Sequence, residues 1–183
     1  MFNMGGQQGV GFDEILSGGG PATVSAWVKT ISGQLAVVWD GRGGNGVGMC
    51  LFVNASDGKP NLTFNPPNSG ISGSTSIADG NWHYIAGAYD GSTAYLYVDG
   101  SMVASGAVAG VSFGGNWSYI GVTYSFVYGA STADETRISR AALSADWLTS
   151  EFNNESSPAT FYSVSFAAIP PSPFKVKSGV ILW

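Results

Sequence analysis

The sequence predicts an all-β domain with a single core between two packed layers, and its length, composition and pattern each indicate this. Its 183 residues suffice for one such core. Charged residues make up only 10% of the chain, whereas 27 residues are glycine, about twice the usual share of ~7%. Short segments rich in β-branched and aromatic residues alternate with glycine-containing turns, which is typical of β-sheets because strands favour such side chains and turns require glycine.

The first strands follow each other closely along the chain. One is expected over residues 22–30, where apolar side chains alternate with the others at the period of two that a strand requires. A second covers residues 34–41 and ends at an Asp-Gly turn. Residues 48–64 are typical of a hairpin closed around another Asp-Gly pair. Residues 65–74 are predicted to be a loop, because their two prolines exclude a central strand.

Three more strands are expected between residues 79 and 105. Residues 82–89 form the first, with the even-numbered side chains on one face and the odd-numbered ones, His83 among them, on the other. An Asp-Gly turn leads into residues 93–98. The pair Asp99-Gly100 then links to residues 101–105, which indicates a type I′ turn because both of its central residues need positive φ.

The last elements are two strands and a helix. The strands are expected over residues 117–122 and 133–139. The helix is expected over residues 143–152, with Ser144 as its N-cap and with a leucine on either side of the cap placed for a hydrophobic staple. One short helix leaves the class all-β.

The sequence divides into a domain over residues 1–168 and a tail over residues 169–183. The tail begins with a proline cluster and ends in the apolar run VILW. This apolar run must be kept away from water. The tail therefore either forms a final strand of the domain's own sheet or docks onto a partner. The net charge of −5, without a basic cluster, excludes nucleic acid as a partner. No apolar run approaches the ~20 residues of a membrane span, and no export signal is expected at the start of the chain.

Three blocks of the sequence carry a resemblance to a known family. Residues 22–30, 79–106 and 133–154, in this order and spacing, are similar to the signature blocks of the laminin-G-like branch of the concanavalin A-like lectin/glucanase superfamily. The resemblance implies a jelly-roll sandwich of two curved antiparallel sheets with one short helix. It leaves residues 9–16 to serve as the first strand. It does not fix the function, because this sandwich hosts lectins, hydrolases, lyases and adhesion modules.

Enzymatic activity is not expected. Glycoside hydrolases of this superfamily place alternate carboxylates on one face of a strand. In both Asp-Glu pairs of this chain the carboxylates are adjacent, so in a strand they should point to opposite faces. The single histidine, His83, excludes a polyhistidine metal site and is expected to be a hydrogen-bonded structural residue. The single cysteine, Cys50, lies in an apolar strand and is expected to be a buried thiol rather than a nucleophile.

Calcium is a question that the resemblance raises. In the pentraxin branch, carboxylates and amides follow a strand that ends in a glycine, but the residues after the matching Gly121 include no carboxylate. Asp134, together with backbone carbonyls, is the candidate ligand of a single calcium ion, as in some laminin-G-like domains. The alternative is that Asp134 is only a turn residue at the start of a strand, because calcium needs six to eight oxygens.

Sugar binding is expected to depend on aromatic residues near the end of the domain. Three of the aromatic residues between positions 117 and 128 stand at alternate positions and would form one stripe on an extended segment, ready to stack on pyranose rings. The alternative is that this stripe packs into the core or into a subunit contact. The candidate ligand-binding residues are Trp117, Tyr119, Tyr124, Phe126 and Tyr128.

The sequence therefore predicts a non-catalytic recognition or surface-display module. We expect it to bind glycans or a cell surface as part of a larger assembly, such as a phage virion, with protein partners held through the tail. A virion or extracellular surface is the expected location. The alternative is a purely structural decoration or assembly protein that binds no glycan.

Overall fold

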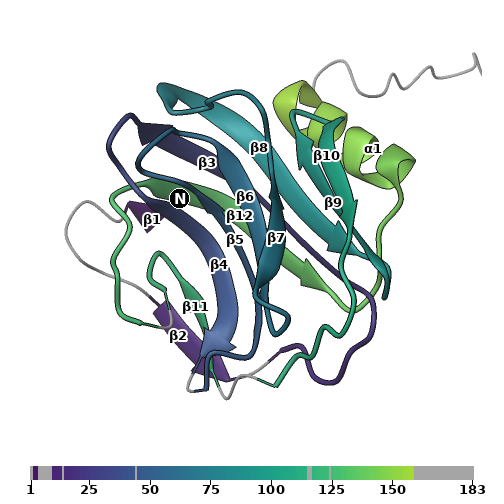
Figure 1. Cartoon of the computed structure of the whole chain (residues 1–183). Coiled ribbons are helices and arrows are strands. Elements are labelled where there is room, and N and C mark those ends of the chain that lie inside the picture. Colours follow the sequence, from purple (N-terminus) through teal and green to yellow (C-terminus); the bar gives the residue numbers. More distant parts are fainter. Residues whose placement is uncertain are drawn as a thin grey trace, which may run out of the picture.

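The computed structural model describes residues 2–3, 10–13, 15–43, 45–114, 117–123 and 125–158. Within these residues, twelve strands and one helix build a two-layered sandwich (Figure 1). The strands are β1 (Phe2–Asn3), β2 (Val10–Asp13), β3 (Ala22–Ile31), β4 (Ala36–Gly43), β5 (Gly48–Val53), β6 (Pro60–Asn65), β7 (Ser69–Ser72), β8 (Asp79–Tyr89), β9 (Thr93–Val98), β10 (Ser101–Ala107), β11 (Trp117–Ile120) and β12 (Thr132–Ser139), and the helix is α1 (Ala145–Ser156).

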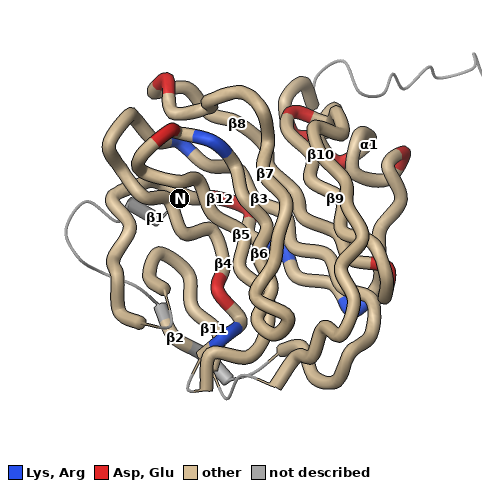
Figure 2. Tube along the Cα trace, viewed as in Figure 1, with Lys and Arg blue, Asp and Glu red and all other residues tan. Residues whose placement is uncertain are grey.

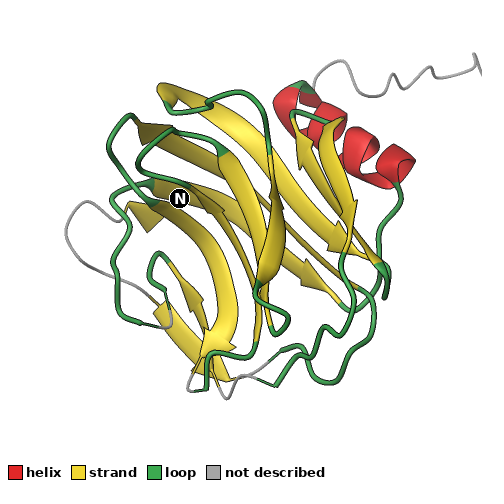
Figure 3. Ribbon diagram, viewed as in Figure 1, coloured by secondary structure: helices red, strands yellow, loops and turns green. Residues whose placement is uncertain are grey.

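The strands form two antiparallel sheets, each with six strands among the described residues. Sheet I has the spatial order β1-β12-β3-β8-β9-β10, and sheet II has the order β2-β11-β4-β5-β6-β7. The chain passes between the sheets through connections of different length, such as residues 32–35 between β3 and β4 and residues 73–78 between β7 and β8, which Figure 3 draws as loops. This is the predicted jelly-roll sandwich, and β2 falls within the residues 9–16 that were expected to supply a first strand.

The core lies between the two sheets. Val24, Ala26 and Val28 of β3, which alternate along the sequence, are all at most 1% exposed there. From the other strands, the rings of Phe64 and Tyr89 meet with their centroids 5.2 Å apart. Because side chains alternate between the faces of a strand, the remaining side chains point outwards, to the outer face of sheet I or of sheet II.

Helix α1 covers part of the outer face of sheet I. Its Leu148 is completely buried against Tyr84 and Ala86 of β8 and Tyr97 of β9. From Tyr84 to Tyr89 both faces of β8 are therefore buried, one in the core and one under the helix. The N-cap is the predicted Ser144, whose side chain accepts a hydrogen bond from the Trp147 backbone. The helix continues to position 156, four residues beyond the predicted end.

Two local predictions have opposite outcomes. The turn at Asp99-Gly100 has φ values of 49° and 75°, as a type I′ turn requires. The prediction of a loop over residues 65–74 is wrong for residues 69–72, which form β7, whereas the exclusion of a central strand is confirmed because β7 is an edge strand. Both prolines precede β7 and lie outside its ladder, and among the described strands β7 pairs with β6 alone. The tail over residues 169–183 lies outside the described residues, so the division at residue 168 stays a prediction.

Candidate binding site

Side chains on the outer face of sheet II line a hollow of about 460 Å³. Its lining includes Arg42 of β4, Cys50 of β5 and Thr63 of β6. Cys50 lies between Asp40 and Thr63 in the register of the sheet, and Arg42 is bonded to Asp40. Cys50 and Thr63 face outwards because their neighbours along the same strands are in the core. The hollow is bordered by the turn before β7, through Asn68, and by the loop after β11, through Thr123.

An ion pair stabilises the floor of the hollow. The Asp40 side chain is 0% exposed and accepts two parallel hydrogen bonds from Arg42, from Nε to Oδ1 and from Nη2 to Oδ2, both at 2.8 Å. The Arg42 backbone N–H also donates to Oδ1, at 3.0 Å. Bidentate pairing of this kind is strong and holds the guanidinium in one orientation. The two charges compensate each other, so the floor carries no net charge.

Cys50 adds a neutral thiol beside this pair. Burial raises the pKa of the thiol well above its usual value, and the nearby carboxylate of Asp40 raises that pKa further. The thiol therefore stays protonated at physiological pH. The predicted burial of Cys50 is confirmed, since it is 1% exposed.

Thr63 places a buried polar atom in sheet II. Its Oγ1 is buried and has no hydrogen-bond partner among the described residues. The backbone around it is fixed, because Thr63 lies in register with Cys50 on one side and with Gly70 on the other. A Cβ at Gly70 would come within 2.9 Å of the Thr63 Cα and 3.0 Å of its Cγ2. Glycine at this position therefore keeps β7 close to Thr63.

Four aromatic residues lie on β11 and on the hairpin that follows it, beside β4 of sheet II. Trp117 is 48% exposed, Phe126 is 65% exposed and Tyr128 is 41% exposed. The ring of Tyr119 is half-buried and meets the ring of Phe126 edge to face, with centroids 6.2 Å apart. We call these four residues the aromatic rim. The three exposed residues, Trp117, Phe126 and Tyr128, do not pack into the core, which excludes that alternative for them. Tyr124, the fifth predicted ligand-binding residue, lies outside the described residues.

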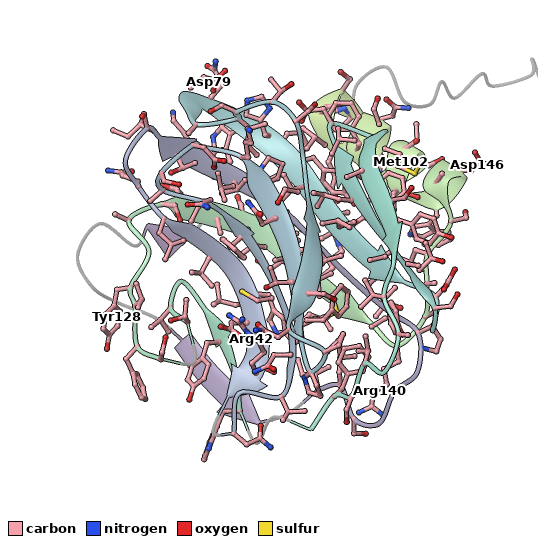
Figure 4. All side chains as sticks on the ribbon, viewed as in Figure 1. Arg42, Asp79, Met102, Tyr128, Arg140 and Asp146 are labelled. Atoms are coloured by element: carbon pink, nitrogen blue, oxygen red, sulfur yellow. The ribbon has the colours of Figure 1, made fainter. Side chains whose placement is uncertain are left out.

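The rim is built on a hairpin. The backbone N–H groups of Thr123 and Phe126 donate to Val127 and Thr123, both at 2.9 Å, and Phe126 has a φ of 60°. The predicted stripe of Tyr124, Phe126 and Tyr128 required an extended segment, and the turn at Phe126 contradicts this for Phe126 and Tyr128. Hydrogen bonds from Gly121 and Ala130 to β4 and the residue before it hold the hairpin against sheet II. Figure 4 shows Tyr128 at the edge of the molecule and Arg42 on the sheet.

A second hollow, of about 870 Å³, lies on the outer face of sheet I beside the end of α1. Asp134 and Glu135 both line it, so the expectation that adjacent carboxylates point to opposite faces is wrong here. The φ of 53° at Glu135 and the register shift between Asp134 and Arg137 mark a β-bulge, which re-aims side chains. Glu14 of the other Asp-Glu pair lies outside the described residues.

The carboxylates of this second hollow are engaged within the protein. Asp134 Oδ1 accepts from the Glu135 backbone at 3.0 Å, and Glu135 Oε2 accepts from Arg137 at 2.7 Å. Glu155 accepts from the indole N–H of Trp27 at 2.6 Å and is also bonded to Arg137. These carboxylates hold the helix and the bulge together.

Two tryptophans of the second hollow, Trp27 and Trp82, were not among the predicted site residues. The alternation predicted for residues 22–30 puts Val24, Ala26 and Val28 on the core face, and therefore puts Trp27 on the opposite face. Its ring packs against Phe152 of α1, with centroids 5.7 Å apart. Sequence periodicity gives the face of a strand, but it does not tell whether a helix covers that face.

The described residues do not assemble a calcium cage. No three His, Cys, Asp or Glu side chains among them are placed so that they could hold one metal ion. The Oδ1 atom of Asp134 is directed to the neighbouring backbone N–H, whereas calcium needs six to eight oxygens. Asp134 as a calcium ligand stays a prediction from the resemblance.

His83 connects two turns of sheet I. Its Nδ1 lies 2.8 Å from Asp99 Oδ2, and its Nε2 lies 3.3 Å from Asp79 Oδ1. Asp99 also accepts from the Tyr84 backbone N–H at 3.0 Å. The imidazole thus fixes the turn between β9 and β10 against β8, which is the structural role predicted for it. Separately, the one helix of the described residues is too short and too polar to cross a membrane.

Comparison with solved structures places the chain among lectin-like folds. A pentraxin from Limulus polyphemus, described as heptameric and SAP-like, has a TM-score of 0.60 at 18% identity, over 78% of this chain and 74% of its own. A Bacteroides ovatus protein proposed to bind carbohydrate has a TM-score of 0.62 at 16% identity, over 76% of this chain and 42% of its own. Botulinum neurotoxin type C, whose cell entry depends on two ganglioside molecules, has a TM-score of 0.57 at 12% identity, over 77% of this chain and 36% of its own.

These likenesses concern the fold. The chain spans less than half of the Bacteroides and botulinum proteins. A search of curated protein sequences gave no significant match. The laminin G family model of the concanavalin A-like lectin/glucanases superfamily matches residues 4–149, which is most of the sequence. The chain therefore belongs to the concanavalin A-like lectin/glucanases superfamily.

Proposed function

We propose that this protein is a non-catalytic glycan-binding module, and that it binds sugar in the hollow of sheet II beside the aromatic rim. The observation that carries the proposal is the hairpin after β11, which borders the polar floor through Thr123 and carries the exposed Phe126 and Tyr128. Aromatic faces stack on the apolar faces of sugar rings, while a few fixed polar groups orient the hydroxyls. The glycan-related functions of the Bacteroides and botulinum proteins support the proposal without extending to this chain by themselves.

The test is a glycan array with the full chain, followed by titration of the strongest hit. Replacing Phe126 or Tyr128 with alanine should weaken binding roughly twofold to tenfold each, because an aromatic contact is worth about 0.5–1.5 kcal/mol beyond its buried area. Trp147→Ala is the matched control, since Trp147 is an aromatic residue 61% exposed on the helix and far from the rim. Binding that ignores both rim substitutions would contradict the site.

Two further arms of the same experiment address calcium and catalysis. The array is repeated with a chelator, and we expect the same hits because the described residues do not assemble a calcium cage. Loss of all hits in chelator would instead support the calcium prediction. Glycans recovered from the protein should be unchanged in mass, because the Cys50 thiol beside the hollow stays protonated and the floor charges are paired. A cleaved glycan would overturn the non-catalytic assignment.

We further propose that the module works within a larger assembly exposed outside the cell, such as a virion. One structural feature favours the alternative of a purely structural decoration protein. Strand β10 forms an edge of sheet I without any charged side chain, and Met102 and Val103 on it are 56% and 38% exposed. Such an edge is prone to pair with another chain.

Deletion of residues 169–183 separates the two functions. Light scattering of the full chain and of the chain ending at residue 168 measures self-association, and the glycan array is run on both. We expect array hits to survive the deletion, because the hollow and the rim lie within residues 35–130. If oligomers vanish with the tail and neither form binds a glycan, the protein is a structural decoration protein.

A further inference from the structure

We infer that the second hollow, on the outer face of sheet I, is the docking site of the chain's own tail, residues 169–183. The inference goes beyond the proposed function, and it does not depend on sugar binding at sheet II. It rests on the charges and rings that line this hollow, on the charges of the tail, and on the point at which the described residues end.

The lining of the second hollow is acidic. Among the described residues that line it, none is basic and four are acidic: Asp99, Asp134, Glu135 and Glu155. Arg137 lies next to them, but its guanidinium is shared among three glutamates, Glu135, Glu151 and Glu155. In Figure 2, helix α1 carries acidic positions and no basic one. This side of sheet I therefore attracts a cationic segment.

Two other groups near the hollow do not cancel its charge. His83 lies 2.8 Å from Asp99, but it also lies 3.3 Å from Asp79, so even a protonated imidazole would face two carboxylates. Lys29 is exposed and stands in register with Trp82, outside the lining of the hollow. Its ammonium adds one positive charge at the border and leaves the carboxylates in excess.

Aromatic rings give the same hollow an apolar part. Trp27 packs against Phe152, with ring centroids 5.7 Å apart, and the half-buried Trp82 lines the hollow with them. Apolar side chains gain free energy when they cover such rings, and an ammonium group is attracted to the face of a tryptophan. The hollow thus suits a segment that is both basic and apolar.

The tail has this composition. Its charged side chains are Lys175 and Lys177, and it contains no acidic side chain. Because these lysines stand at alternate positions, an extended segment would present both ammonium groups on one face, where they can meet separate carboxylates. The apolar run VILW follows Gly179, and the rings of the hollow can keep this run away from water.

The described residues end at the hollow itself. Pro158, the last of them, is part of its lining. From Pro158 to Lys175 the chain can reach about 55 Å when extended, which is ample for a return to the hollow. A tethered segment has a high effective concentration at its own domain, so the chain's own hollow is favoured over that of another copy.

The first test is cross-linking of the full chain with a carbodiimide, which joins a lysine directly to a carboxylate that it contacts. Mass spectrometry of the digested protein identifies the linked residues. We expect Lys175 or Lys177 to be joined to a carboxylate of the hollow, in protein of monomer mass. The yield should fall several-fold in concentrated salt, which screens exposed charges.

The second test is hydrogen exchange of the full chain that carries Lys175→Gln and Lys177→Gln together. The amides of residues 132–136 and 152–158, beside the hollow, should exchange roughly twofold to tenfold faster, as expected for the loss of two exposed ion pairs. Lys59→Gln is the matched control, because it removes a lysine that is paired with Asp57. It should leave the exchange of these amides unchanged.

Each result decides the inference. Links within one chain, together with faster exchange in the lysine variant, support it. Links found only in dimers would place the tail in the hollow of another copy and overturn docking in its own domain. Tail lysines linked only to carboxylates outside the hollow, or not linked at all, would overturn the hollow as the docking site. Unchanged exchange in the lysine variant would overturn the role of the two lysines. The proposed function fails on the glycan array instead, so the two failures are distinguishable.

Discussion

Replacing Asp40 with alanine is expected to lower the free energy of unfolding by about 3–5 kcal/mol, the cost of leaving a buried charge without its partner. Asp40 is 0% exposed, and it accepts three hydrogen bonds from Arg42. Without the carboxylate, the guanidinium must either remain uncompensated or swing out of the hollow. The measurement is urea denaturation followed by circular dichroism.

The control for Asp40→Ala removes both charges together. Replacing Asp40 with leucine and Arg42 with methionine should recover most of the loss, because an apolar pair of similar volume often substitutes for a buried ion pair without cost. If the single variant loses less than about 1 kcal/mol, the ion pair does not stabilise the floor as described. The double variant also tests whether the hollow needs the polar pair to bind sugar.

Replacing Leu148 with alanine is expected to destabilise the protein by about 2–5 kcal/mol, because it deletes buried methyl groups and leaves a cavity. Leu148 is the one completely buried residue of α1 among the described residues, and it packs on Tyr84, Ala86 and Tyr97. We expect α1 to detach from sheet I before the rest of the domain unfolds. Detachment of α1 should change the tryptophan fluorescence, because Trp27 of β3 packs against Phe152 of α1.

The neighbouring residue provides the control for this prediction. Trp147 is 61% exposed, and its replacement with alanine should change the free energy of unfolding by less than about 0.5 kcal/mol. Thermal unfolding of both variants makes the comparison. Equal effects of the two substitutions would mean that α1 is not held to sheet I through Leu148.

The sequence predicted the strands well wherever local chemistry decides the structure. Periodicity placed β3 with the correct face inwards, and the Asp99-Gly100 pair predicted its turn type because few residues tolerate positive φ at both positions. The bulge at Glu135 could not be predicted in this way. Its positive φ falls on a residue that has no preference for it, so the surrounding sheet and the Arg137 contacts must impose it.

The candidate site was predicted only in part. Exposed aromatic residues were expected at Phe126 and Tyr128, but the hairpin that carries them depends on hydrogen bonds to β4 and the residue before it, far away in the sequence. The floor was missed altogether. Arg42, Cys50 and Thr63 lie on three different strands, and a threonine in a strand is ordinary. That its hydroxyl has no partner among the described residues is a property of the assembled sheet.

The position of α1 determines how the module can be displayed. The helix lies on the outer face of sheet I, and the hollow lies on the outer face of sheet II, so the core separates them (Figure 1). If the protein is attached to a support through the segment that follows α1, the link leaves the domain on the side of sheet I. Copies anchored in this way on a particle or on a sensor chip would present their hollows away from the support, in an arrangement that favours multivalent capture of a glycan-coated surface.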